Sequence, residues 1–228
     1  MASIGEGNIV SLAKKAQALG ADIIELRLDR MKKFDESEDA FRQVRKAAHL
    51  PIISTIRWRK ESGGAYRSFL SERRRRDLFF RVIPYTDAVD IEINSGIFSA
   101  VAREARKRKK TVIASYHNFR TLPPFEQLSS LVRKGIRRGG HIVKIAAYAR
   151  SLQDAGRLLG FCLSFRPGTM AAVAMGEAGK LARYAAPLFG SALIYGYIDR
   201  PYGPGQVKVS EIKAVSYTHL TLPTNREV

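Results

Sequence analysis

Cysteine is nearly absent from this chain of 228 residues, since Cys162 is the only one. A single thiol cannot form an internal disulfide, and it cannot supply the several ligands of a cysteine-rich zinc site. A chain without such cross-links is suited to a reducing compartment. We therefore expect a cytoplasmic protein, held together by a hydrophobic core that a chain of this length is able to bury.

Long hydrophobic runs are missing as well. The longest apolar stretch, Tyr184–Ile198, contains Pro187 and two glycines. It falls short of the roughly 20 apolar residues of a membrane-spanning helix. No basic head followed by an apolar core, the pattern of a signal peptide, opens the sequence. We therefore expect a soluble protein with no membrane partner.

Acidic residues are few compared with basic ones, 21 against 39, which gives a formal net charge of +18. The basic residues gather in clusters at Arg73–Arg76, Arg106–Lys110 and Arg133–Arg138. Such charge attracts nucleic acids or anionic substrates. The clusters lie in helical stretches, however, and lack the interleaved aromatic residues of a single-strand binding groove. We expect them to be solvated outer faces of helices, and a basic nucleic-acid-binding protein is the less favoured alternative.

Short apolar segments rich in β-branched residues alternate along the chain with longer, charged segments of helical period. The first kind predicts strands at Ile23–Leu28, Ile52–Ile56, Ala88–Ile93, Thr111–Ser115, Ile142–Ala146, Met170–Met175 and Ala192–Tyr197. The second kind predicts helices at Ile9–Leu19, Asp39–Ala48, Ser71–Ile83, Ser99–Lys109, Pro124–Arg137, Ser151–Cys162 and Glu177–Ala186. Ala2–Ile4 is interpreted as the remnant of one more strand, which makes eight.

Strands that are apolar on both faces and separated by helices indicate a parallel sheet, hence an α/β fold. Eight such units in a chain of this length predict a (β/α)8 TIM barrel. An open doubly wound sheet is the alternative, but no glycine-rich dinucleotide fingerprint follows the first strands. We expect the first strand to be clipped and the last helix to be truncated.

The end of the chain does not fit this pattern. A helical pattern begins at Ser210 and stops at Val215, where the sequence continues Val-Ser-Tyr-Thr-His-Leu-Thr-Leu-Pro-Thr. This run resembles translated sequencing-adapter read-through, so we exclude it from the fold. The prediction is one catalytic barrel domain over residues 1–214 and a non-native tail over residues 215–228.

In a barrel of this kind the carboxyl ends of the strands line the active site. Polar or distinctive side chains stand at these ends in chain order: Glu25, Arg27, Arg57, Glu61, Asp90, Glu92, His117, Lys144 and Met175. Glu25 and Arg27 are two residues apart and so share one face of their strand, as do Asp90 and Glu92.

Lys144 is the most informative of these residues because it interrupts an apolar strand. Lysine is rarely buried unless it is paired. One interpretation is a structural salt bridge to Asp90 or Glu92 on a neighbouring strand. The other is a catalytic amine, which burial would keep neutral and able to condense with a ketone. His117, on the adjacent predicted strand, is a candidate general acid and base.

Seven segments together carry a resemblance to a known family. They are Glu25-Leu26-Arg27-Leu28-Asp29, Thr55-Ile56-Arg57 with Glu61 and Gly63-Gly64, Asp90-Ile91-Glu92, Ser115-Tyr116-His117-Asn118-Phe119, Val143-Lys144-Ile145-Ala146, Met175-Gly176 and Pro204-Gly205-Gln206. They resemble, in order, the motifs of type I dehydroquinases. The resemblance implies dehydration of 3-dehydroquinate to 3-dehydroshikimate in the shikimate pathway. It also implies a lysine Schiff base, no metal or organic cofactor, and a homodimer.

The resemblance further implies a role for each residue. Lys144 would form the imine and His117 would move the proton, held by Glu61 with Asp90 and Glu92 as support. The substrate-binding set would be Glu25, Arg27, Arg57, Arg183, Gln206 and Met175, with Arg183 taking the carboxylate. Tyr202 departs from the pattern, because many members of the family have serine at that place. Ser3 matches an early polar contact.

A Schiff-base aldolase shares the barrel and the lysine, and it is the second enzyme class considered. Such aldolases usually act on phosphorylated sugars, which barrels bind through glycine-rich loops after the last two strands. Glu177 follows Met175-Gly176 and would place an acid where the phosphate binds. This residue disfavours the aldolase.

Overall fold

The computed structural model describes residues 1–31, 37–64 and 70–220. Within them, nine strands form one sheet in the order β7-β6-β5-β4-β3-β2-β1-β8-β9, and each neighbouring pair is parallel. The strands are β1 (Ala2–Ile4), β2 (Ile24–Arg27), β3 (Ile52–Thr55), β4 (Ala88–Glu92), β5 (Thr111–Asn118), β6 (Ile142–Tyr148), β7 (Met170–Met175), β8 (Gly196–Tyr197) and β9 (Val207–Lys208).

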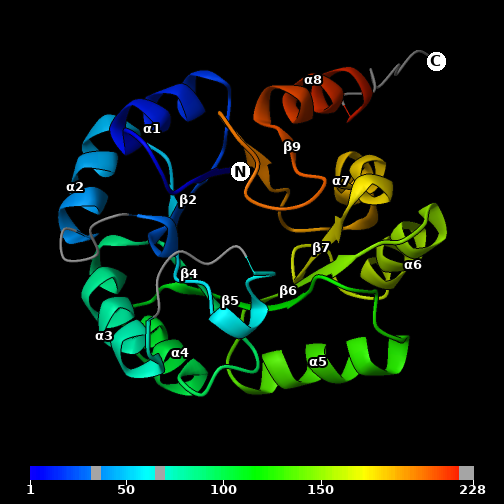
Figure 1. The fold of residues 1–228 in the computed structure, drawn as a ribbon, viewed down its shortest axis with the longest axis horizontal. Coiled ribbons are helices and arrows are strands. Elements are labelled where there is room, and N and C mark those ends of the chain that lie inside the picture. The colour runs from blue at the N-terminus through cyan, green and yellow to red at the C-terminus, as the bar shows by residue number, and fades with distance from the viewer. Residues whose placement is uncertain (32–36, 65–69, 221–228) are drawn as a thin grey trace, which may run out of the picture.

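Helices follow one another in chain order around the outside of the curled sheet (Figure 1). They are α1 (Ile9–Ala18), α2 (Ser37–Ala47), α3 (Glu72–Val82), α4 (Phe98–Lys107), α5 (Phe125–Arg137), α6 (Leu152–Leu163), α7 (Lys180–Ala185) and α8 (Val209–Leu220). The predicted TIM barrel is confirmed, including the three-residue first strand. In the described residues, no helix combines the length and apolarity needed to cross a bilayer.

The eighth predicted strand, Ala192–Tyr197, was too long, because only Gly196–Tyr197 forms a ladder. Side-chain and single backbone contacts replace the ladder in the preceding residues. The Ser191 hydroxyl accepts a hydrogen bond from the Ala172 backbone N–H at 3.0 Å, and the Ala192 N–H donates to the Met170 carbonyl at 2.7 Å. Among the described residues, no ladder joins β7 to β8.

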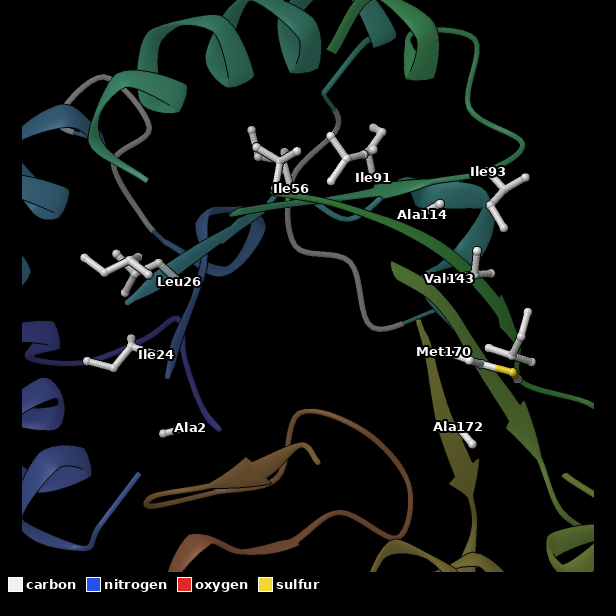
Figure 2. Packing of buried hydrophobic residues seen from close by; sticks show 14 of the residues in the cluster. Ala2, Ile24, Leu26, Ile56, Ile91, Ile93, Ala114, Val143, Met170 and Ala172 are labelled. Carbon is white, nitrogen blue, oxygen red and sulfur yellow. The ribbon is translucent and has the colours of Figure 1, made fainter. Parts of the chain in front are cut away.

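Two layers of apolar side chains arise from the alternation along each strand. The outer layer lies between sheet and helices and includes Ile24, Leu26, Ile91 and Val143 (Figure 2). The inner layer fills the barrel and includes Ile53, Ile113, Ala171 and Val173. Because Val143 and Ile145 belong to the outer layer, Lys144 between them faces the barrel interior.

The last helix, α8, runs to Leu220, although we predicted that the helical pattern stops at Val215. Val209 and Ile212 anchor its first turns in buried positions. Gly196 on β8 makes room for them, because a Cβ at this position would lie 2.9 Å from both side chains. Residues 221–228 lie outside the described residues, so the non-native tail stays a prediction.

Candidate active site

A pocket opens at the carboxyl ends of the strands, and it gathers the residues that the sequence singled out. All of the predicted catalytic and substrate-binding residues line it: Lys144, His117, Glu61, Glu25, Arg27, Arg57, Arg183, Gln206 and Met175. The two predicted supporting residues, Asp90 and Glu92, are fully buried on β4 and contact Arg57.

Lys144 is 4% exposed, and its Nζ lies 2.9 Å from Asp90 Oδ2. The salt bridge considered in the sequence therefore exists, with Asp90 as the partner. Burial lowers the pKa of the Lys144 amine, and the positive charge of Arg57 acts in the same direction, while Asp90 opposes them. The amine is thus both paired and biased toward its neutral, nucleophilic form.

Asp90 also belongs to a buried network with Arg57. The Arg57 Nη1 donates to Asp90 Oδ1 at 3.1 Å and to Glu92 Oε1 at 2.7 Å. The Ser115 hydroxyl donates to Asp90 Oδ1 at 2.6 Å. Although burial opposes its ionisation, Arg57 and Lys144 hold the pKa of Asp90 well below its usual range. Asp90 is therefore a fixed negative charge beside the lysine.

His117 on β5 and Glu61, which ends the short 3-10 helix η2 (Arg59–Glu61), form a second pair. Glu61 Oε2 accepts the His117 backbone N–H at 2.8 Å and lies 3.3 Å from His117 Nδ1. Burial and the neighbouring Glu92 raise the pKa of Glu61 to about 8. Burial, together with Arg57 and Lys144, holds the pKa of His117 well below its ordinary value. The imidazole is therefore neutral near pH 7 and able to accept a proton.

Glu25 and Arg27 are fixed by hydrogen bonds to neighbouring side chains. The two carboxylate oxygens of Glu25 accept the hydroxyls of Ser3 at 2.6 Å and Thr55 at 2.8 Å. Arg27 donates to both oxygens of Asp29, at 3.0 and 2.8 Å. The short first strand is thus sufficient to bring Ser3 against the site, and a bidentate pair fixes the guanidinium of Arg27.

Arg183 lies on α7 and is 5% exposed. Its Nη2 donates to the Pro204 carbonyl at 3.0 Å, while its Nε has no hydrogen-bond partner within the described residues. Burial lowers the pKa of this arginine to about 10. No acidic residue neutralises it there in the part of the chain that the structure describes. An anionic ligand would supply the counter-charge and the hydrogen-bond acceptor that Arg183 lacks there.

The loop that carries Gln206 is fastened beside the pocket by backbone contacts. The Gly176 N–H donates to the Pro204 carbonyl at 3.2 Å. Gly205 has a φ of +67°, and a Cβ on it would lie 2.1 Å from the Gly176 carbonyl oxygen, so only glycine fits. The Tyr202 hydroxyl accepts the Gly5 N–H at 3.0 Å, and the Tyr202 N–H donates to Gln206 Oε1 at 2.7 Å. Tyr202 thus ties the loop to the end of β1.

The sequence interpretation was wrong about one arginine of the 73–76 cluster. Arg75 is fully buried rather than solvated. Its Nη2 contacts Glu92 Oε2 at 2.6 Å and donates to the Ile56 carbonyl at 2.8 Å. A helical signal was present, because Arg75 stands three and four residues before the buried Leu78 and Phe79 and so shares their face. Arg57 is shared between Asp90 and Glu92, so Arg75 supplies a second buried cation beside the Glu92 carboxylate.

Tyr195 was also missed, because it stands in a run that was interpreted only as apolar strand. Its ring belongs to the inner layer and lines the pocket. The Lys144 Nζ lies 3.9 Å from the centroid of that ring. Tyr195 and Tyr197 both stand in this run, so the sequence alone does not single out the tyrosine that meets the lysine.

Comparisons with known proteins agree with this geometry. The family model described as type I 3-dehydroquinase matches residues 6–221. The chain is 34% identical to 3-dehydroquinate dehydratase of Aquifex aeolicus, over 92% of this chain and 93% of that protein. It is also 34% identical to 3-dehydroquinate dehydratase of Methanothrix thermoacetophila, over 93% and 88% of the two chains. The crystal structure of the Aquifex aeolicus enzyme superposes with a TM-score of 0.85 at 30% identity, covering 97% of this chain and 98% of that one. This chain belongs to the type I 3-dehydroquinase family.

Proposed function

We propose that this protein dehydrates 3-dehydroquinate to 3-dehydroshikimate through a Schiff base on Lys144. One observation carries the proposal. The buried amine of Lys144 opens into the same pocket as the neutral imidazole of His117 on the adjacent strand. An amine that forms an imine and a base beside it are what this elimination requires.

In the first step the Lys144 nitrogen adds to the C3 carbonyl carbon, and the carbonyl oxygen leaves as water. The resulting iminium withdraws electrons and makes the C2 proton acidic. His117 removes that proton, and the electron pair moves into the iminium to give an enamine. The pair then returns and expels the C1 hydroxyl, which leaves as water after the same imidazole protonates it. Hydrolysis of the second iminium releases the enone product and restores the lysine.

The surroundings of the lysine favour these steps. The fixed charge of Asp90, 2.9 Å from the nitrogen, stabilises both the ammonium and the iminium. Glu61 orients the ring of His117 through its contacts with the backbone N–H and Nδ1. No metal and no organic cofactor is needed in this proposal, because the iminium supplies the electron sink.

The remaining pocket residues bind the substrate in this proposal. Arg183 pairs with the carboxylate, because its buried guanidinium keeps an unpaired Nε–H among the described residues. Glu25, Arg27 and Arg57 take the ring hydroxyls, Gln206 closes the site from its loop, and Met175 packs against the ring. The family relationship also supports a cytoplasmic location and a homodimer. Exposed leucines on neighbouring elements offer apolar surface for a partner subunit: Leu152, Leu163, Leu181 and Leu188.

The test combines turnover with chemical trapping. Adding 3-dehydroquinate should produce the absorbance of a conjugated enone. Adding borohydride together with this compound should fix one ligand mass on Lys144, and borohydride alone should leave the mass unchanged. Lys134 on α5, which is partly exposed and does not line the pocket, serves as a matched position. Lys144→Arg should abolish turnover and trapping, since a guanidinium forms no imine, whereas Lys134→Arg should retain both.

A second variant separates the steps of the reaction. His117→Ala should still be trapped by borohydride but should lose turnover by roughly 10²–10⁴-fold, the usual contribution of acid and base catalysis. Label on another lysine, or turnover that survives Lys144→Arg, would refute the Schiff-base proposal. Retro-aldol activity on sugar phosphates without enone formation would favour the aldolase instead.

A further inference from the structure

The nitrogen of Lys144 has a second neighbour besides Asp90. Tyr195 lies immediately before β8 and is 6% exposed. The Lys144 Nζ sits 3.9 Å from the centroid of its ring, within the distance at which the negative face of an aromatic ring attracts a cation. The Tyr195 hydroxyl is buried without a hydrogen-bond partner in the described part of the chain.

We propose that the ring face of Tyr195 is a positioning element for Lys144, which holds its nitrogen and stabilises the cationic iminium formed there, while the phenol hydroxyl takes no part. The inference rests on the proposed function, because the iminium is an intermediate of that reaction. It adds a cation-binding surface that does not itself carry charge or exchange protons.

The ring and Asp90 differ in what they stabilise. A carboxylate beside the nitrogen favours any positive charge but also competes as a proton acceptor. An aromatic face favours the same charge without accepting a proton, and it does so most strongly where water is excluded. The partnerless hydroxyl supports this division, since a catalytic phenol would need a proton acceptor or donor. Burial also raises the pKa of Tyr195 well above its usual value, so the phenol stays neutral.

Several charged groups act on the Lys144 nitrogen, and the test has to separate the ring from them. Burial lowers the pKa of the amine and Arg57 lowers it further, whereas Asp90 and Glu25 raise it. Other titratable or charged groups that line the same pocket are Glu61, His117, Arg27, Arg30 and Arg183. None of these is changed by a substitution at position 195. The ring favours the ammonium, so its removal should lower the pKa of the amine.

The experiment measures borohydride trapping with 3-dehydroquinate across a pH series, for the wild type and two variants. Tyr195→Phe keeps the ring and should match the wild type within about twofold, with the same midpoint pH. Tyr195→Leu removes the ring. Its midpoint should move to lower pH, because the amine loses its proton more easily. Its maximal trapped fraction should fall by roughly tenfold, because the iminium loses the ring's attraction.

A graded series keeps the test decisive if Tyr195→Leu folds poorly. Phenylalanines with increasing ring fluorination can be placed at position 195 by suppression of a stop codon. They keep the shape of the ring and progressively weaken its negative face. The midpoint pH and the trapped fraction should both decrease in step with fluorination.

Three outcomes would overturn the inference. A flat response across the fluorinated series, with the wild type trapped normally, refutes the role of the ring and leaves the proposed function intact. A loss in Tyr195→Phe as large as that in Tyr195→Leu assigns the role to the hydroxyl. Absence of trapping on Lys144 in the wild type removes the proposed function and this inference together.

Discussion

Several side chains of the site interact in pairs. In the pair of Glu61 and His117, the raised pKa of Glu61 makes the free energy of unfolding depend on pH. Glu61 has a pKa of about 8 in the folded chain, against an ordinary value of 4.5. Between these pH values the folded chain retains a proton that the unfolded chain has released. The free energy of unfolding therefore decreases as the pH rises, by at most about 1.4 kcal/mol per pH unit for one proton.

Glu61→Gln keeps the shape of the side chain but cannot ionise. We predict that the unfolding free energy of the wild type, minus that of Glu61→Gln, decreases between about pH 5 and pH 8 and levels off above that range. Urea denaturation at several pH values measures both curves. Parallel curves would contradict the prediction, and would indicate that Glu61 ionises in the folded protein as it does in the unfolded chain.

At the scale of secondary-structure elements, α3 is linked to the site through one side chain. Arg75 passes from the buried face of α3 to Glu92 on β4, and Glu92 in turn accepts a hydrogen bond from Arg57. Removing one partner of a buried ion pair leaves the other charge uncompensated, which costs about 3–5 kcal/mol. The helix is therefore part of the charge balance of the site as well as of its outer wall.

Arg75→Met is predicted to lower the unfolding free energy by about 3 kcal/mol, because Glu92 keeps only Arg57 as a cation. Arg73→Met, on the exposed face of the same helix, is the matched control and should change it by less than about 0.5 kcal/mol. Chemical denaturation of both variants provides the comparison. Equal effects would mean that Arg75 contributes no more than a solvated arginine.

The elements also show where prediction from the sequence succeeds. The bounds of β7 and of the short β1 agree with the predicted segments, because apolar runs between turns mark buried parallel strands clearly. The predicted catalytic and substrate-binding residues line one pocket, since the ends of parallel strands meet at one face of a barrel, while the predicted supporting residues Asp90 and Glu92 are buried on β4. The roles of these residues stay a prediction.

Other features depend on contacts between distant parts of the chain and were not predicted. The first part of the predicted eighth strand, before Gly196, forms no ladder, and the chain is held there by contacts such as that of Ser191, a residue whose hydroxyl gives no periodic signal. Arg75 was counted with its charged neighbours, although only its position relative to Leu78 and Phe79 decides that it is buried. The Tyr195 ring contacts Lys144, although 51 positions separate the two residues in the sequence (195 − 144). Local patterns carry no information on such pairs.

At the scale of the whole molecule, the boundary of the barrel remains to be tested. If residues 215–228 are a non-native tail, a chain ending at Ala214 should unfold within about 2 °C of the full chain, because a change below about 0.5 kcal/mol produces no larger shift at this size. A chain ending at Leu220, which retains all of α8, is the control. Thermal unfolding of the three chains gives the answer. A large drop for the chain ending at Ala214 alone would assign the end of α8 to the fold.

Because no ladder joins β7 to β8 within the described residues, the barrel has a seam there. Isolated hydrogen bonds cross it beside the packed inner-layer side chains, among them the Ala172 N–H to the Ser191 hydroxyl and the Ala192 N–H to Met170. Lys144 stands on one side of the seam, and Tyr195 stands on the other. Everywhere else along the sheet, widening the barrel would break a continuous ladder, whereas here it would break isolated bonds. A ligand joined to Lys144 and held by Gln206 would link the two sides of the seam. Occupancy of the pocket would therefore stabilise the closed barrel against opening between β7 and β8.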